Sequence, residues 1–99
     1  MSYLPPEDCH SPRNRWSLFT VLEDHGPEDF SVAIGRWDGD ACLAMRWNGS
    51  KENPVGNPQS RGLPTWFIMP EQYADKIIQS LPAAKQTLAR TLIPELGKK

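Results

Sequence analysis

The chain has 99 residues, a formal net charge of −1 and a hydrophobic content of 38%, which predicts one small domain and excludes two ordinary ones. The near-zero net charge gives no general argument for binding to nucleic acid, because phosphate binding depends on a surplus of Lys and Arg. Four Trp and ten Pro indicate a small core rich in aromatic side chains and a largely irregular backbone.

The cysteines and the N-terminal residues indicate the compartment. Cys9 and Cys42 do not make a disulfide framework, and we interpret both as free thiols. The N-terminal residues lack the basic start and apolar stretch of a signal peptide. No apolar run approaches the roughly 18 residues that a membrane span needs. The cytoplasm is therefore the expected compartment.

The N-terminal third of the sequence divides into an arm and a strand. Residues 1–15 contain three prolines and no periodic apolar pattern, which predicts a flexible N-terminal arm. Residues 16–22 are rich in aromatic and β-branched side chains and end at a polar turn cluster, which predicts a first strand. A single α+β domain is expected over residues 16–93, followed by a basic tail over residues 94–99.

The central segment predicts a β-hairpin. Residues 30–37 and 41–48 flank Asp38-Gly39, a dipeptide typical of two-residue hairpin turns. Only an even loop length keeps the apolar side chains of both strands on one face. The two-residue turn predicts the opposed pairs Ile34 with Leu43, Val32 with Met45, and Phe30 with Trp47.

The opposite face of this hairpin carries mainly small side chains, namely Ser31, Ala33, Gly35, Cys42 and Ala44. Small side chains leave the backbone of a sheet accessible. One interpretation is a face that meets solvent or is covered by a loop. The other is close approach of something flat, either a second sheet in a dimer or stacked bases.

The second half of the sequence predicts a loop, a strand and helices. Residues 48–62 contain three Gly and two Pro, and a loop of this length indicates function or disorder. Residues 63–69 predict a fourth strand, in which Pro64 favours an edge position. Apolar spacing after Pro70 predicts an amphipathic helix.

The remaining residues predict a second helix. Pro82 interrupts the first helix, and Ser80 is expected to cap a second one that ends before Pro94. The expected fold is thus an α+β, four-stranded antiparallel sheet in the order β-β-β-β-α, with one or two C-terminal helices packed on one face. Trp16, Trp47 and Trp66 are expected in its core, with Trp37 at the end of the hairpin.

No catalytic site, metal site or cofactor is predicted. A nucleophile, a base and an oxyanion donor cannot be named together in this sequence, and Asp8-Cys9-His10 lacks a second pair of ligands at metal-site spacing. We therefore expect that the protein is not an enzyme. Catalysis would require a pocket that joins His25 or a cysteine to the Arg61 or Gln59 of the loop.

Binding is better supported than catalysis, because positive side chains alternate with aromatic ones around the predicted sheet and loop. Aromatic rings together with guanidinium groups commonly hold single-stranded nucleic acid. The candidate residues for contact with nucleic acid or a protein partner are Arg36, Trp37, Arg46, Lys51, Gln59 and Arg61.

Three segments resemble the transcriptional positive cofactor family of single-stranded DNA-binding proteins and its Whirly relatives. They are Gly35-Arg36-Trp37-Asp38-Gly39, Ala44-Met45-Arg46-Trp47 and the strand-to-helix step that ends in Pro70-Glu71-Gln72. The similarity covers residues 16–81 and includes the expected element order. It implies a dimer formed through the helices, a sheet offered to single-stranded DNA or RNA, and Arg36, Arg46, Lys51 and Arg61 as contacts to the nucleic-acid backbone.

Two functional hypotheses are consistent with these features. The first is a small non-enzymatic regulatory protein that binds single-stranded nucleic acid as a dimer. The alternative is a protein-interaction or regulatory module, of the kind encoded on mobile elements, that uses the sheet face and the loop of residues 48–62. The low positive charge of the chain favours the alternative, and the aromatic and arginine pattern favours the first.

Overall fold

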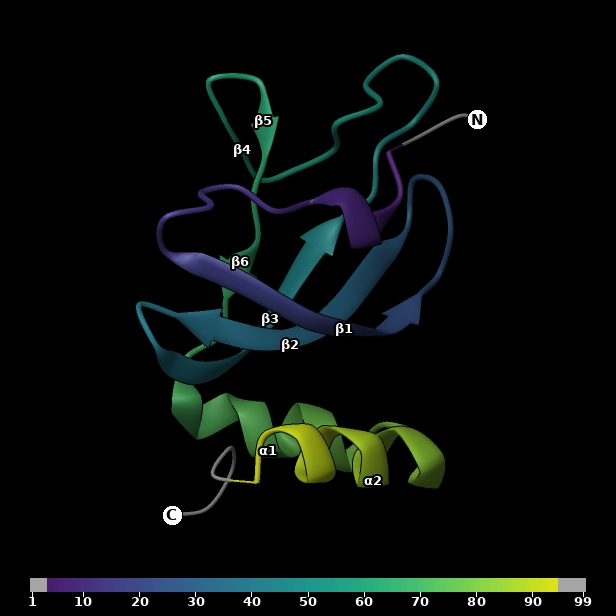
Figure 1. Cartoon of the computed structure of the whole chain (residues 1–99). Helices are drawn as coiled ribbons and strands as arrows, with labels where there is room; N and C mark the ends of the chain where they lie inside the picture. Colours follow the sequence, from purple (N-terminus) through teal and green to yellow (C-terminus); the bar gives the residue numbers. More distant parts are fainter. Residues whose placement is uncertain (1–3, 95–99) are drawn as a thin grey trace.

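The computed structural model describes residues 4–94 and arranges them in three layers. In Figure 1 the N-terminal arm lies above a four-stranded antiparallel sheet and two helices lie beneath it. The order of strands in the sheet is β1 (Trp16–Asp24), β2 (Phe30–Trp37), β3 (Asp40–Trp47) and β6 (Phe67–Ile68). The helices are α1 (Glu71–Gln79) and α2 (Ala83–Leu92). The expected α+β fold is confirmed.

The central hairpin has the predicted register. Phe30 pairs with Trp47, Val32 with Met45 and Ile34 with Leu43, around a turn of two residues. Asp38 and Gly39 both have positive φ angles, of 52° and 88°, as this turn type requires.

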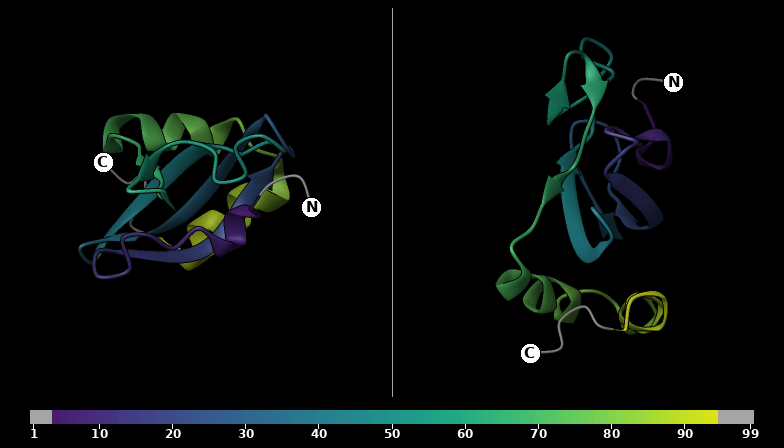
Figure 2. Two further views of the ribbon diagram at one scale, coloured as in Figure 1. Left: turned by 90° about the horizontal axis from the view of Figure 1, so that it is seen from above. Right: turned by 60° about the vertical axis from the view of Figure 1, so that its left-hand side comes forward.

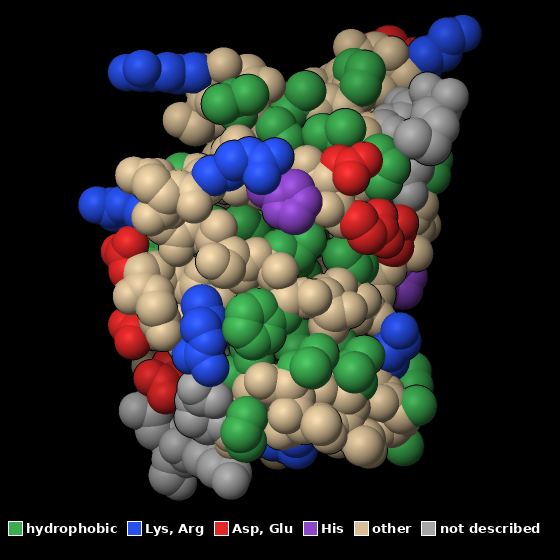
Figure 3. Space-filling view, in the orientation of Figure 1, with side chains coloured by type: hydrophobic (Ala, Val, Ile, Leu, Met, Phe, Trp, Pro, Cys, Tyr) green, Lys and Arg blue, Asp and Glu red, His purple; other side chains and the backbone are tan. Residues whose placement is uncertain are grey.

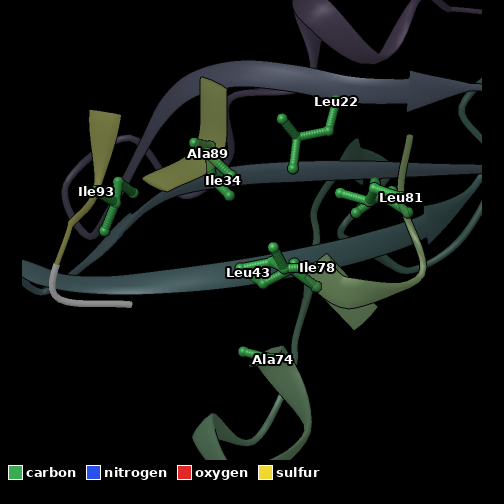
Figure 4. Packing of buried hydrophobic residues seen from close by; sticks show 9 residues of the cluster. Leu22, Ile34, Leu43, Ala74, Ile78, Leu81, Ala89 and Ile93 are labelled. Carbon is green, nitrogen blue, oxygen red and sulfur yellow. The ribbon is translucent and has the colours of Figure 1, made fainter. Parts of the chain in front are cut away.

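The helices cover one face of the sheet and form the larger core with it. Figure 4 shows Leu22, Ile34 and Leu43 of the strands pointing toward side chains of the helices. The helices contribute Ala74, Ile78 and Ala89 to this core, and the residues that follow them contribute Leu81 and Ile93. Both helices present the apolar stripe that their spacing predicts, and burial of these stripes against the sheet stabilises them.

The small-residue face of the sheet is covered by the N-terminal arm. A short 3-10 helix, η1 (Pro6–Asp8), lies over it, and Cys9 is completely buried in a second cluster with Trp16 and Trp66. The indole Nε1 of Trp66 donates a hydrogen bond of 2.8 Å to the carbonyl oxygen of Cys9. Of the two interpretations of this face, the structure shows the loop-covered one.

The sequence predicts a flexible arm over residues 1–15, and in the structure residues of this arm, such as Leu4 and Cys9, pack against the sheet. Small side chains on the sheet leave room for the arm, and the large side chain of Trp66 packs in the same cluster as Cys9. Residues 1–3 and all but the first residue of the predicted tail lie outside the described residues.

The predicted fourth strand is divided in two. Pro64 lacks a backbone N–H, and it belongs to a separate two-stranded hairpin of β4 (Gln59–Ser60) and β5 (Leu63–Pro64). Only Phe67 and Ile68 join the main sheet, where β6 is an edge strand beside β3. Figure 1 and the right view of Figure 2 place the β4–β5 hairpin away from the helices, at the other end of the molecule.

The predicted cap of the second helix is also wrong. Ser80 Oγ donates to the carbonyl oxygen of Ile77 at the end of α1, whereas α2 begins after Pro82, which makes no side-chain capping bond. The fixed φ of proline suits a helix start without such a bond.

The loop after β3 is ordered and closed on itself. Trp47 and Asn57 exchange two backbone hydrogen bonds, of 2.7 and 3.0 Å, which close residues 48–56 into a compact loop. Gly56 has a φ of +71° and lies so near this bridge that a Cβ atom there would meet the Trp47 carbonyl oxygen at 2.3 Å. A side chain at this position would therefore open the loop.

Trp47 is the clearest error of the expected core. Trp16 and Trp66 are buried, as expected, but Trp47 is 59% exposed. The alternation of side chains assigns Trp47 correctly to the face that the helices cover, but the helices do not reach its end of β3. In Figure 1 the arrowhead of β3 points away from the helices.

Candidate functional site

The uncovered end of the helix-side face holds an apolar groove of about 680 Å³. Its exposed aromatic side chains are Trp47 on β3 and Phe67 on β6, each 59% exposed. The half-buried side chains of Phe30, Met45 and Met69 lie between and beside them, and Asn57 and Pro58 of the loop close one end. Exposed apolar patches of this kind commonly mark interaction sites.

Strand pairing and ring contacts position the groove. Met45 pairs with Phe67 across β3 and β6, and Phe30 pairs with Trp47 across β2 and β3. The Phe30 and Trp47 rings meet edge to face with centroids 6.3 Å apart, and the His25 ring lies 4.4 Å beyond Phe30. The groove is therefore held by regular strands rather than by free loops.

A buried polar network anchors the strand ends beside the groove. The Asn48 side-chain amide donates to Asp24 and to the carbonyl oxygen of Gly26, and its oxygen accepts a 2.8 Å bond from Ser31 Oγ. Ser31 and Asn48 are buried, so these bonds satisfy groups that would otherwise be costly to remove from water. They join the ends of all three long strands.

Arg46 contributes no free charge to the groove, although the sequence predicts it as a contact. Its side chain is only 4% exposed, and its guanidinium donates to the carbonyl oxygens of Thr65 and Val55. It also lies over the Trp66 ring at 5.9 Å. Burial lowers the pKa of this guanidinium from its ordinary value. The arginine therefore ties the loop to the sheet.

Arg36 and Trp37 lie together at the turn end of the central hairpin. Arg36 donates to the carbonyl oxygen of Gly39 and lies over the Phe19 ring at 5.5 Å. Trp37 is half-buried, with the Arg15 guanidinium 5.9 Å from its ring centre. Neither residue lines the groove, so this pair is separate from Arg46 and from the exposed aromatic rings.

The remaining three predicted site residues belong to the loop region. Lys51 is exposed at the tip of the closed loop, whereas the Gln59 amide donates to the carbonyl oxygen of Gly56 and so supports that loop. Arg61 is exposed at the turn of the β4–β5 hairpin. The six predicted residues therefore occupy separate positions and do not form one surface.

The groove is missed by sequence reasoning because the aromatic side chains are assigned to the core. One signal was present. Trp66 and Phe67 are consecutive, and consecutive side chains of a strand point to opposite faces. Trp66 points to the arm and is buried, so Phe67 necessarily points to the other face, where it pairs with Met45.

Both cysteines are buried free thiols without the properties of nucleophiles. Burial raises the pKa of Cys9, and it raises the pKa of Cys42 to about 11. The reactive form of cysteine is the thiolate, so both side chains are unreactive at neutral pH. Neither lines the groove.

We expect the stability of the fold to fall in alkaline solution because of Cys42. Its thiol keeps its proton up to about pH 11 in the native state and loses it near pH 9.0 when unfolded. The stability that the protonated Cys42 thiol contributes to the native state is fully present below pH 9. It is lost between pH 9 and pH 11, as the free energy of unfolding falls by up to about 1.4 kcal/mol per pH unit. Urea unfolding of the wild type and Cys42→Ala across this range measures it. Equal slopes for the two proteins would contradict the expectation.

Metal-ligating side chains and membrane-spanning helices also bear on function. No three His, Cys, Asp or Glu side chains within residues 4–94 are grouped so that they could hold a metal ion. No helix in that part of the chain has the length and apolar character to cross a membrane. His25 lies near Glu23 and Phe30. It does not line a pocket together with Arg61, as the catalytic alternative requires.

Comparison of the chain with protein-family models, with curated proteins and with solved structures finds no match.

Proposed function

We propose that this chain is a non-enzymatic protein-interaction module whose apolar groove binds an extended, apolar segment of a partner protein. The observation that carries the proposal is the pair of large aromatic side chains, Trp47 and Phe67, that stand 59% exposed on either side of a preformed groove. Aromatic side chains in desolvated pockets contribute most of the binding energy in protein interfaces.

The backbone beside the groove supports an extended partner. Strand β6 is the last strand of the sheet, and within residues 4–94 no strand pairs with its outer edge. An extended segment can add to such an edge through backbone hydrogen bonds while its alternate side chains enter a neighbouring groove. The groove of about 680 Å³ is large enough for several apolar side chains.

The charge of the groove supports an apolar protein segment over nucleic acid. Arg46 is the one charged residue among the side chains that line it, and its guanidinium is committed to Thr65 and Val55. The small-residue face of the sheet, where one interpretation placed stacked bases, is covered by the arm. Binding of single-stranded nucleic acid through Trp47 stays the competing proposal, because an exposed indole also stacks on bases.

Peptide selection tests the proposal even though the partner is unidentified. A library of random twelve-residue peptides is panned against the wild type and counter-selected against the Trp47→Ser, Phe67→Ser double variant. We expect apolar peptides whose affinity, measured by fluorescence anisotropy, falls at least about tenfold with either single change. Phe19→Ser removes a partly exposed aromatic ring on β1, outside the groove, and is expected to change affinity less than about twofold.

Three outcomes would overturn the proposal. The first is that no selected peptide depends on Trp47 or Phe67. The second is that a fluorescent thirty-nucleotide oligothymidylate binds at low salt and loses affinity in Trp47→Ser. The third is a dimer, detected by light scattering of the wild type, that Trp47→Ser or Phe67→Ser dissociates, because the occupant of the groove would then be a second copy of the chain.

A further inference from the structure

A second hollow, of about 560 Å³, lies between the N-terminal arm and the β4–β5 hairpin. It shares no lining residue with the apolar groove, so a ligand in this hollow would bind independently of the proposed function. The arm contributes His10, Ser11 and Arg13, and the hairpin and the residue after it contribute Ser60, Arg61 and Thr65. Six hydrogen-bond donors therefore meet from two segments about fifty residues apart in the chain.

Both walls of this hollow are fixed by hydrogen bonds. On the arm, Trp66 Nε1 holds the carbonyl oxygen of Cys9, next to His10, at 2.8 Å. The Leu4 amide donates to the Pro54 carbonyl oxygen at 2.9 Å. On the other wall, the Thr65 amide donates to Pro58 and the Thr65 carbonyl oxygen accepts from Arg46. The backbone of both walls is therefore held in place before a ligand binds.

The charged side chains that line the hollow, Arg13, Arg61 and Asp8, give it a net positive charge. Arg13 and Arg61 make no ion pair with another described residue, and Asp8 is the one acid in the lining. Figure 3 shows a basic side chain directly against a histidine over the arm, with acidic side chains to one side. The planar guanidinium group matches the oxygens of a phosphate, to which it donates two parallel hydrogen bonds.

The backbone of Arg61 adds a further indication. Its φ of +53° and that of Gly62, +79°, are those of a two-residue hairpin turn that Asn-Gly ordinarily occupies. A left-handed conformation costs a residue such as arginine about 1 kcal/mol. Asparagine would form this turn at a lower cost. The residue found there is an arginine whose side chain lines the hollow.

We propose that this hollow binds the phosphate group of a small phosphomonoester. Arg13 and Arg61 contact the terminal phosphate oxygens, and Ser11, Ser60, Thr65 and His10 supply further donors. The volume exceeds what a phosphate ion alone fills, and the apolar side chains of Leu4 and Leu63 in the same lining are suited to an organic group attached to it.

Calorimetric titration with inorganic phosphate and with phenyl phosphate, at low ionic strength, tests this proposal. We expect phenyl phosphate to bind more tightly than inorganic phosphate. We expect Arg13→Gln and Arg61→Gln each to weaken phenyl phosphate at least about tenfold. Lys51→Gln removes the same charge outside the hollow and is expected to change affinity less than about twofold. Urea unfolding confirms that the variants fold as the wild type does.

The outcomes distinguish the source of the phosphate. Tighter binding of phenyl phosphate supports a phosphomonoester. Equal binding of the two probes, weakened by both arginine changes, would contradict the phosphomonoester and assign the site to free phosphate. Binding that survives the Arg13→Gln, Arg61→Gln double change would overturn the proposal. Absence of binding by either probe up to about 10 mM would overturn it as well.

Discussion

Replacement of Arg46 by methionine is expected to lower the free energy of unfolding by about 3 kcal/mol. The methionine side chain fills part of the same space, but it leaves the carbonyl oxygens of Val55 and Thr65 without their buried donor. It also removes the cation over the Trp66 ring. Because a domain of this size is stabilised by about 5–15 kcal/mol in all, the change removes a large part of its stability.

Two further variants make the Arg46 result specific. Arg46→Lys keeps the charge but replaces the planar fork, whose two nitrogens donate to the two carbonyl oxygens, with one ammonium nitrogen, and it is expected to lose most of the same stability. Arg36→Met removes an arginine that is only half-buried at the hairpin turn, and it is expected to cost less than about 1 kcal/mol. Urea unfolding followed by tryptophan fluorescence measures all three. An Arg46→Met protein within about 0.5 kcal/mol of the wild type would show that the arginine does not hold the loop.

Replacement of Gly35 by alanine is expected to cost about 3 kcal/mol or more. A Cβ atom at Gly35 would lie 2.2 Å from the carbonyl oxygen of Ser17 and 2.7 Å from the ring of Trp16. The first of these atoms belongs to the backbone of the neighbouring strand, so no rotamer change relieves the contact. Strand β1 or the indole must therefore move away from the sheet.

Gly39→Ala is the matched control, because it makes the same change in the same hairpin. Its Cβ atom would meet nothing within 4 Å, and only its φ of +88° opposes alanine. That conformation costs about 1 kcal/mol, so Gly35→Ala is expected to be the more destabilising of the two. Thermal and urea unfolding compare them. The reverse order would show that β1 does not approach Gly35 closely.

The hairpin and the helices were predictable because their signals are local. Asp38-Gly39 determines the turn, and the turn then determines which side chains are opposed. Apolar spacing and the positions of Pro70 and Pro82 determine where the helices lie. Each of these features depends on residues close together in the sequence.

The packing of the arm leaves no such pattern in the sequence. The arm is held largely through backbone groups, such as the Cys9 carbonyl oxygen that accepts from Trp66, and any residue type supplies a carbonyl oxygen. The arm is also irregular, so its buried residues follow neither a period of 2 nor one of 3.6. The position of the arm depends on Trp66, which is far from it in the sequence and packs against Cys9 in the folded chain.

Sequence reasoning missed the groove because helix α1 is shorter than strand β3. Alternation assigns a side chain to a face of the sheet, but it does not say how much of that face a helix covers. The nine residues of α1 span about 14 Å, whereas the eight residues of β3 span about 26 Å. Part of the strand therefore extends beyond the helix, and Trp47 is its last residue.

Binding of an apolar segment in the groove is tested most directly by a nuclear magnetic resonance titration. A selected apolar peptide is added to the ¹⁵N-labelled protein. We predict that the largest shifts fall on the Trp47 indole and on the backbone amides of Met45, Phe67 and Ile68, with little change at the hairpin turn. Shifts confined to that turn or to the Arg61 region, with the Trp47 indole unchanged, would contradict it.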